Sequence, residues 1–164
     1  MQTEQERIDF FNKQLGTNID LLDKVNWWYV SMCCELSEEF ISVFYDKLDW
    51  QWVSRRYILS EDFIRNIQDK VDWFWISHYQ EFSEDFIREF QNKVYWRYIS
   101  LYQTLSEDFI REFKDKVDWA YISEHQKLSE DFIREFANSV SWAYIFECQD
   151  ISENFREEFK DKIR

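Results

Sequence analysis

The side chains best suited to chemistry are two histidines and three cysteines. His78 and His125 could act as general bases or metal ligands, but neither lies in a metal-binding signature such as HExxH. Cys33, Cys34 and Cys148 have no metal-ligand spacing, and their odd number favours a reducing compartment. From these residues we expect neither a catalytic histidine nor a metal site.

Serines and carboxylates are numerous, but their positions indicate structural roles. A serine recurs every 23 residues, at Ser37, Ser60, Ser83, Ser106, Ser129 and Ser152, and none of these lies in a nucleophile elbow. The single glycine, Gly16, excludes a glycine-rich phosphate loop. Carboxylate pairs can act as acid and base, but here they follow the serines at exposed helix starts. We therefore expect no catalytic residue, no cofactor and no enzymatic activity.

Aromatic side chains are the stronger candidates for binding. A tryptophan recurs with the same period, at Trp27, Trp50, Trp73, Trp96, Trp119 and Trp142. The position two residues later is also aromatic: Tyr29, Trp52, Trp75, Tyr98, Tyr121 and Tyr144. Two residues of helix are about 200° apart, so the two series point in opposite directions. The second series either packs between repeats or lines a groove where rings could stack on bases, sugars or a peptide.

Two charged series are the next candidates. Glutamate follows each repeated serine, at Glu38, Glu61, Glu84, Glu107, Glu130 and Glu153. This acidic edge could attract a basic segment or imitate a row of phosphates, or it could serve helix dipoles and solubility. The arginines Arg65, Arg88, Arg111 and Arg134 could bind an anion, but each follows a glutamate by four residues and should be neutralised.

Positions that vary between repeats are where specificity for a ligand should reside, because the fold does not require them. These positions include Arg55, Arg56, Tyr57, His78, Arg97, Tyr102 and His125. We include Arg55, Arg56, His78, Arg97 and His125 with the second aromatic series as candidate binding residues.

The period of 23 residues excludes one continuous helix. At 100° per residue, 23 residues overshoot six turns by about 140°, so an apolar stripe would rotate away at each repeat. Serine followed by two acids, as at Ser106, predicts the start of one helix. Residues that can cap a second helix precede the repeated tryptophans, namely Asn26, Asp49, Asp72, Asp118 and Ser141, with Tyr95 as the exception.

Each repeat is thus expected to be a pair of helices of about 11 and 8 residues, stabilised by stacking on its neighbours. In the repeat beginning at Ser106, the first helix should carry ion pairs between Glu107 and Arg111 and between Glu112 and Lys116. The second should run roughly from Trp119 to Gln126. The fold class is all-α, an α-solenoid of tandem 23-residue helix pairs.

We expect a single domain over residues 1–164, with a degenerate N-terminal cap over 1–26, repeats over 27–150 and a C-terminal capping helix over 151–164. In the N-terminal cap, Thr3 and Glu6 can form a capping box, and Gly16 can end the helix. In the last unit, Arg156 replaces the isoleucine found in the other units, as suits a face without a further repeat.

Composition narrows the function classes. Aromatic residues form 21% of the chain. The net charge of -13 argues against direct nucleic-acid binding, because phosphate contacts require cationic patches. No apolar run is long enough for a membrane span, and no signal peptide is apparent, so we expect a cytoplasmic protein.

The unit LSEDFIREFxxKVxW resembles the short helical repeats of uncharacterised proteins from giant, mimivirus-type DNA viruses and related environmental sequences. The resemblance covers about residues 20–164 and implies a viral or phage-like origin and, for a viral protein, the host cell cytoplasm; it brings no activity or ligand. The repeat architecture predicts a non-enzymatic scaffold for protein–protein interaction. Two alternatives stay open: an acidic decoy or sponge that captures a basic host protein or a small nucleotide, and a structural protein that self-associates through its end faces.

Overall fold

The computed structural model describes residues 3–162, and within that range it contains thirteen α-helices, two short 3₁₀ helices and no strand. The chain divides into two compact units, and the boundary between them in the sequence falls between Gln80 and Glu81. Unit 1 contains α1 (Glu4–Leu15), η1 (Leu22–Lys24), α2 (Trp27–Cys33), α3 (Glu38–Val43), α4 (Trp50–Arg56), α5 (Glu61–Asn66) and α6 (Trp73–Tyr79). Unit 2 contains α7 (Glu84–Glu89), α8 (Trp96–Tyr102), α9 (Glu107–Glu112), α10 (Trp119–His125), α11 (Glu130–Glu135), α12 (Trp142–Cys148), α13 (Glu153–Glu158) and η2 (Lys160–Lys162). The assignment of one domain to the whole chain stays a prediction.

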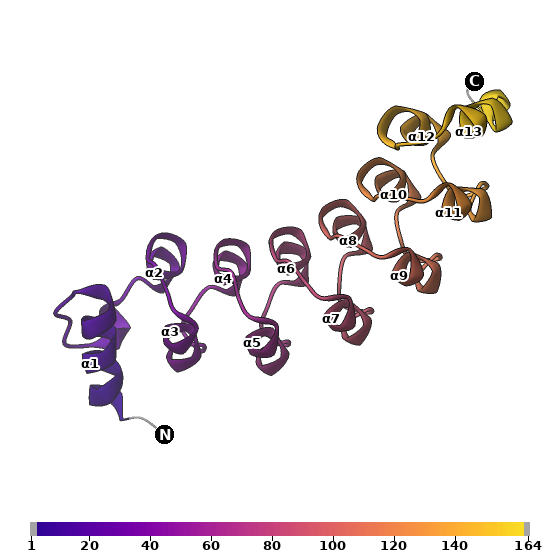
Figure 1. Cartoon of the computed structure of the whole chain (residues 1–164). Helices are drawn as coiled ribbons and strands as arrows, with labels where there is room; N and C mark the ends of the chain where they lie inside the picture. Colours follow the sequence, from indigo (N-terminus) through magenta and orange to yellow (C-terminus); the bar gives the residue numbers. More distant parts are fainter. Residues whose placement is uncertain (1–2, 163–164) are drawn as a thin grey trace. The chain divides into compact units, whose positions relative to one another are not determined.

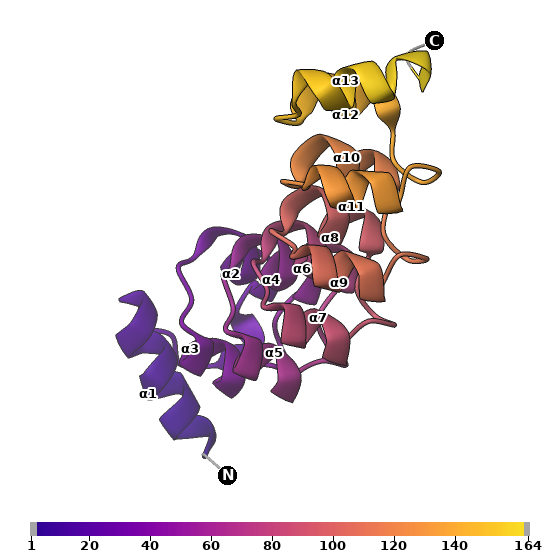
Figure 2. The ribbon, with the colours of Figure 1, turned by 45° about the vertical axis from the view of Figure 1, so that its right-hand side comes forward.

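Within each unit the helices form two rows (Figure 1). In unit 1, α2, α4 and α6 pack side by side in one row, while α3 and α5 lie in the other. In unit 2, α8, α10 and α12 pack in one row, opposite α7, α9, α11 and α13. Figure 2 shows the same alternation from a second side. The predicted all-α solenoid of helix pairs is therefore confirmed.

Side-chain caps begin the helices as predicted, except at Ser141. Each repeated serine precedes the first helix of its pair and accepts a hydrogen bond from the backbone N–H three residues later. For example, Ser106 accepts from the Phe109 N–H at 3.2 Å. Asp118 caps the second helix by accepting from Ala120. Tyr95 makes no side-chain cap, as expected, but the prediction for Ser141 is wrong, because its hydroxyl makes no cap bond either. The backbone at Ser141 has ψ 103°, whereas it is 154° at Ser106, and from a conformation of this kind the longer aspartate and asparagine side chains reach the amides, as at Asp118 and Asn26.

The first helix of each pair has six α-helical residues, as in Glu107–Glu112, so the expectation of about 11 is wrong. Residues 113–116 form a turn instead. Two hydrogen bonds explain the break: the Trp119 indole N–H donates to the carbonyl of Lys114 at 3.0 Å, and the Asp118 N–H donates to Ser100 Oγ at 2.9 Å. In a continuing helix, that carbonyl and that N–H would bond to each other.

The early end of this helix also overturns one predicted ion pair. Glu107 and Arg111 pair as expected, at 3.6 Å, but Glu112 does not pair with Lys116. Glu112 instead accepts a 2.8 Å bond from Arg88 Nε of the preceding repeat, and the Lys116 amino group donates to Gln91 at 2.8 Å.

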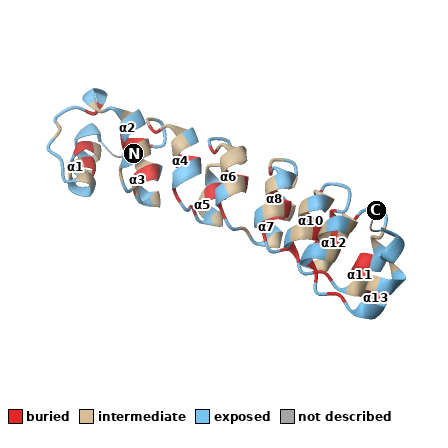
Figure 3. Cartoon of the chain, turned by 90° about the horizontal axis from the view of Figure 1, so that it is seen from above, coloured by how far each residue is buried: buried red, intermediate tan, exposed pale blue. Residues whose placement is uncertain are grey.

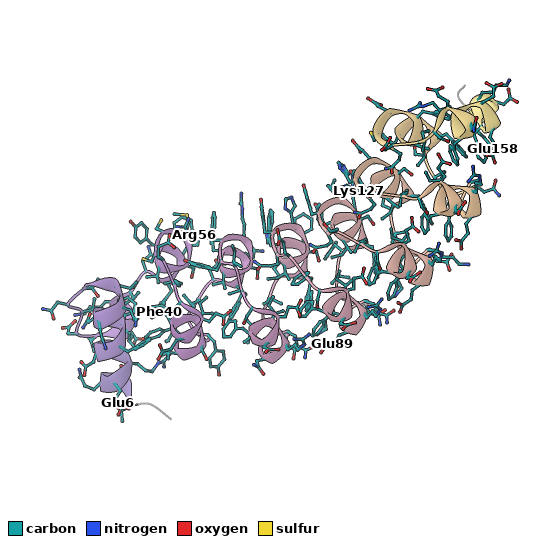
Figure 4. All side chains as sticks on the ribbon, viewed as in Figure 1. Glu6, Phe40, Arg56, Glu89, Lys127 and Glu158 are labelled. Atoms are coloured by element: carbon teal, nitrogen blue, oxygen red, sulfur yellow. The ribbon has the colours of Figure 1, made fainter. Side chains whose placement is uncertain are left out.

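The core lies between the two rows of each unit, and buried positions recur in every repeat (Figure 3). Each second helix contributes a buried isoleucine or valine, such as Ile122, and every first helix except α5 contributes an almost fully buried phenylalanine, such as Phe109. In unit 2, the tryptophan that begins a second helix packs on the phenylalanines of the following first helix; the Trp119 and Phe136 rings lie 4.9 Å apart. At the N-terminal end, the ring of Phe40, which is labelled in Figure 4, packs against the rings of Phe10 and Phe11 from α1.

Two sets of buried polar side chains join consecutive repeats, and neither was foreseen from the sequence. The first is a serine in each second helix, fully buried at Ser31, Ser54, Ser77, Ser100 and Ser123. Ser123 Oγ donates to the Trp119 carbonyl at 2.6 Å and accepts from the Ser141 N–H of the next repeat at 2.9 Å. The hydroxyl therefore donates within its own helix and accepts from the residue that begins the next helix of the row.

The second set is a buried glutamine at the end of four second helices: Gln80, Gln103, Gln126 and Gln149. The Gln126 carbonyl oxygen accepts from the Leu105 N–H at 2.9 Å, and its amide donates to the carbonyls of Gln103 at 2.8 Å and Ser100 at 3.3 Å. Gln126 thus binds backward to the loop of the preceding repeat, as Gln149 does, while Ser123 binds forward.

Two of the three exceptions to these series lie at the ends of the array. Cys34 occupies the first glutamine position, where no earlier loop of this kind precedes it, and Phe146 occupies the last serine position. The capping box of Thr3 and Glu6 and the left-handed Gly16, with φ 63°, form as predicted at the N-terminus. At the C-terminal end, Arg156 donates to the Phe146 carbonyl at 3.3 Å.

Tyr57 occupies the second glutamine position and reproduces part of the glutamine's role. Its hydroxyl lies 3.0 Å from the Ser31 carbonyl and 2.6 Å from the Cys34 carbonyl, the equivalents of the two carbonyls that Gln126 contacts. Burial raises the pKa of Tyr57 to about 12, although the nearby Arg56 opposes the shift.

This pKa predicts a pH-dependent contribution to stability. Below about pH 10, tyrosine is neutral in both folded and unfolded chains, so the contribution of Tyr57 is complete. Between about pH 10 and about 12 the unfolded chain ionises first, and about 2 kcal/mol of unfolding free energy should be lost. Urea unfolding of wild type and Tyr57→Phe at pH 9 and pH 11.5 measures it: the variant should be less stable at pH 9, and the difference should shrink at pH 11.5. A difference that does not change with pH would contradict this assignment.

Candidate functional site

Each member of the second aromatic series is the third residue of a second helix. Five members are partly buried, Trp52, Trp75, Tyr98, Tyr121 and Tyr144, and one is exposed, Tyr29. The fourth residue of the same helices, such as Ile76 or Ile122, is fully buried in the core. The series is therefore shared between packing and the surface.

In unit 1, these residues take part in a continuous run of contacts over α2, α4 and α6, which are neighbours in the row of second helices. The ring of Trp28 lies 6.2 Å from that of Trp52, edge to face. The guanidinium carbon of Arg55 lies 5.4 Å from the Trp52 ring centroid and 4.9 Å from that of Trp75. Trp75 in turn stacks on Tyr79 at 5.8 Å. We call Trp28, Trp52, Arg55, Trp75 and Tyr79 the aromatic row.

Two of these residues were missed from the sequence. Trp28 and Tyr79 leave 50% and 45% of their surface exposed, so they are the most accessible rings of the aromatic row. The available signal was their position: Trp28 directly precedes a member of the second series, and Tyr79 follows Trp75 by four residues on the same helix face.

Other candidates in unit 1 lie beside the aromatic row or at its margin. The His78 ring packs at a tilt of 39° against that of Tyr79, with ring centroids 4.2 Å apart. Arg56, labelled in Figure 4, is the last residue of α4 and forms a 3.0 Å ion pair with Glu35. Tyr29 is 55% exposed and lines a pocket of about 400 Å³ whose other residues include Phe11 and Leu15.

In unit 2, the corresponding face is differently composed. Arg97 donates a 2.7 Å hydrogen bond to the hydroxyl of Tyr121, and His125 stacks on the same tyrosine at 6.1 Å. Glu124 and Glu147 place a carboxylate on α10 and on α12. By contrast, α2, α4 and α6 of unit 1 contain no carboxylate at all, in a chain with net charge -13.

The acidic edge takes part in joining the repeats. Glu107 accepts the N–H of Ser129, the cap of the next first helix, at 2.6 Å. Glu130 accepts in the same way from Ser152 at 2.7 Å, and hydrogen bonding by Ser152 lowers the pKa of Glu130. The repeated glutamates thus stabilise the start of the following repeat.

The repeated arginines are neutralised as predicted. Arg111 lies 2.7 Å from Asp108 and 2.8 Å from Glu135 of the next repeat, and its guanidinium carbon is 5.0 Å from the Phe132 ring centroid. The hydrogen bond from Arg111 to Glu135 raises the pKa of the arginine. Arg88 and Arg134 make the equivalent contacts.

Within residues 3–162, no group of three or more histidine, cysteine, aspartate or glutamate side chains is placed to hold a metal ion. Over the same range, no helix combines the length and apolar character that crossing a membrane requires. Comparisons with family models, with curated proteins and with solved structures found no match to this chain. The resemblance to repeats of giant DNA viruses accordingly stays a prediction.

Proposed function

We propose that this protein is a non-enzymatic repeat scaffold that binds a segment of a partner protein on the outer face of α2, α4 and α6. The observation that carries the proposal is the aromatic row, which runs over three consecutive helices without a carboxylate. Exposed aromatic side chains and arginine are the residue types that contribute most to binding at protein interfaces. The fold does not require an aromatic residue at the position of Trp28, because Gln51, Ala120 and Ala143 occupy it in other repeats.

The decoy alternative has weaker support, because the acidic edge already has partners. The repeated glutamates accept from the serine caps of the next repeat, as Glu107 does from Ser129. The aspartates that follow them pair with arginines, as Asp108 does with Arg111. A basic partner would have to compete with these bonds.

Self-association by end-to-end stacking has weaker support for a related reason. Continued stacking of repeats needs a glutamine that reaches backward and a serine that reaches forward. The first repeat has Cys34 and the last has Phe146 at these positions. A second copy placed at either end would therefore lack the hydrogen bonds that join neighbouring repeats.

The absence of an enzymatic role is supported by the partners of the candidate nucleophiles and bases. The repeated serines cap helices, and the acids next to them are engaged in ion pairs or backbone hydrogen bonds. His125 stacks on Tyr121 and lies 3.4 Å from Glu124.

A selection of peptides tests the proposal. A phage-displayed library of random short peptides is selected on the full chain, and bound peptides are then measured by fluorescence anisotropy. The variant Trp28→Ser/Tyr29→Ser/Tyr79→Ser, which changes three exposed rings, should weaken binding at least about tenfold. Tyr45→Ser is the matched control, because Tyr45 is 50% exposed but lies in the turn after α3. Equal affinity for the wild type and the triple variant, with circular dichroism unchanged, would reject this face as the binding surface.

A further inference from the structure

Arg55 differs in its surroundings from the other arginines of the second helices. Its guanidinium lies between the indoles of Trp52 on α4 and Trp75 on α6, within 5.4 Å of each ring centroid. Stacking on aromatic rings holds the plane of a guanidinium while its N–H groups stay directed outward at the edges. The side chain is thus held in place for a bidentate contact before any ligand binds.

The charge of Arg55 is also not neutralised. Arg56 pairs with Glu35, and Arg97 donates to the Tyr121 hydroxyl. Arg111, on a first helix, contacts three carboxylates. Arg55 is exposed, and within residues 3–162 it forms neither an ion pair nor a hydrogen bond. Its donors are therefore free for a group from outside the chain.

The surrounding charges select the kind of anion. The three helices that carry the aromatic row have no carboxylate, so nothing on them competes for Arg55. The whole chain has a net charge of -13, so a polyanion such as nucleic acid is repelled. One carboxylate among apolar residues matches a single guanidinium flanked by rings.

Resting on the function proposed above, we propose that Arg55 binds the side chain of one aspartate or glutamate in an extended segment of the partner protein. The apolar neighbours of that acid pack on Trp28 and Trp52 on one side and on Trp75 and Tyr79 on the other. Neighbouring helices of a row are about 10 Å apart, and an extended chain advances about 3.3 Å per residue. The apolar residues of the partner should therefore lie about three positions before and after the acid.

The test measures the coupling between the two charged groups. Peptides selected from the random library on the full chain are synthesised with their acid intact or changed to the matching amide, aspartate to asparagine or glutamate to glutamine. Fluorescence anisotropy gives the Kd for wild type, for Arg55→Gln and for Arg97→Gln, a matched arginine of the equivalent face in unit 2. We expect the acidic peptide to lose about tenfold in affinity for Arg55→Gln and to keep its affinity for Arg97→Gln. The amide peptide should bind wild type and Arg55→Gln equally.

The other outcomes separate this inference from the proposed function. If the selected peptides lack an acid, or if Arg55→Gln binds them as wild type does, while the triple variant at Trp28, Tyr29 and Tyr79 loses binding, the carboxylate assignment is wrong and the scaffold stands. If no peptide depends on those three rings, both are wrong. Arg55-dependent binding of single-stranded oligodeoxythymidine, tested alongside, would overturn the assignment to a protein partner.

Discussion

Replacing Gln126 with leucine should lower the free energy of unfolding by about 3 kcal/mol, although the two side chains have similar size. The glutamine accepts from the Leu105 N–H and donates to the carbonyls of Gln103 and Ser100, all in the preceding repeat. Leucine would leave these backbone groups without a partner in a buried site, and each unsatisfied group costs about 1 to 3 kcal/mol. Urea denaturation followed by tryptophan fluorescence measures the total loss.

Hydrogen exchange shows whether the loss has the stated cause. In the Gln126→Leu chain, the Leu105 amide should exchange much faster, because its acceptor is gone. Gln51→Leu is a suitable control, since Gln51 is exposed and its side chain makes no hydrogen bond within the described residues. If Gln126→Leu were as stable as the Gln51→Leu chain, the glutamine series would not join the repeats.

The repeated fold could be predicted because its signals are local. A serine followed by acids begins a helix, and an aspartate before a tryptophan begins another, whatever lies elsewhere in the chain. The structure confirms both at Ser106 and Asp118. The arithmetic of 23 residues then excludes a continuous helix, which leaves stacked pairs.

Helix length and polar packing could not be predicted, because they depend on bonds between repeats. Ser100 Oγ accepts from the Asp118 N–H, and the Trp119 indole N–H donates to the Lys114 carbonyl. These two groups are then not available to each other, so the first helix ends sooner than its sequence requires. Ser100 and Gln126 appear in the sequence as ordinary polar residues of a short amphipathic helix. Their burial follows from the row in which the helices stack, and no periodicity within one repeat reveals it.

The candidate site was partly predictable for the same reason. The second aromatic series and the variable Arg55 were visible as repeated and unrepeated residues. Their contact was not, because Arg55 and Trp75 are on different helices and meet only when α4 packs on α6. Trp28 and Tyr79 belong to positions without a repeated residue type, so only their exposure distinguishes them.

The end of the array provides the second prediction with a large effect. Phe146 stands where the preceding repeats have a buried serine, and it lies 5.8 Å from the ring of Trp142 while its carbonyl accepts from Arg156. Phenylalanine at this position therefore suits a repeat with no further second helix to bind. Introducing it one repeat earlier, as Ser123→Phe, should detach the last repeat.

Ser123→Phe should cost about 4 kcal/mol. The Ser141 N–H loses its acceptor, which costs about 2 kcal/mol, and a ring forced into a fully buried position between α10 and α12 adds about as much. Since each repeat contacts its neighbours, the loss should be local: amides of residues 142–158 should exchange rapidly while those of α8 and α9 stay protected. Ser123→Ala separates the two contributions, because it removes the hydroxyl without adding bulk and should cost about 2 kcal/mol. Equal exchange in the Phe and Ala variants would mean that the lost hydrogen bond alone accounts for the effect, and Phe146 would then have no role in ending the array.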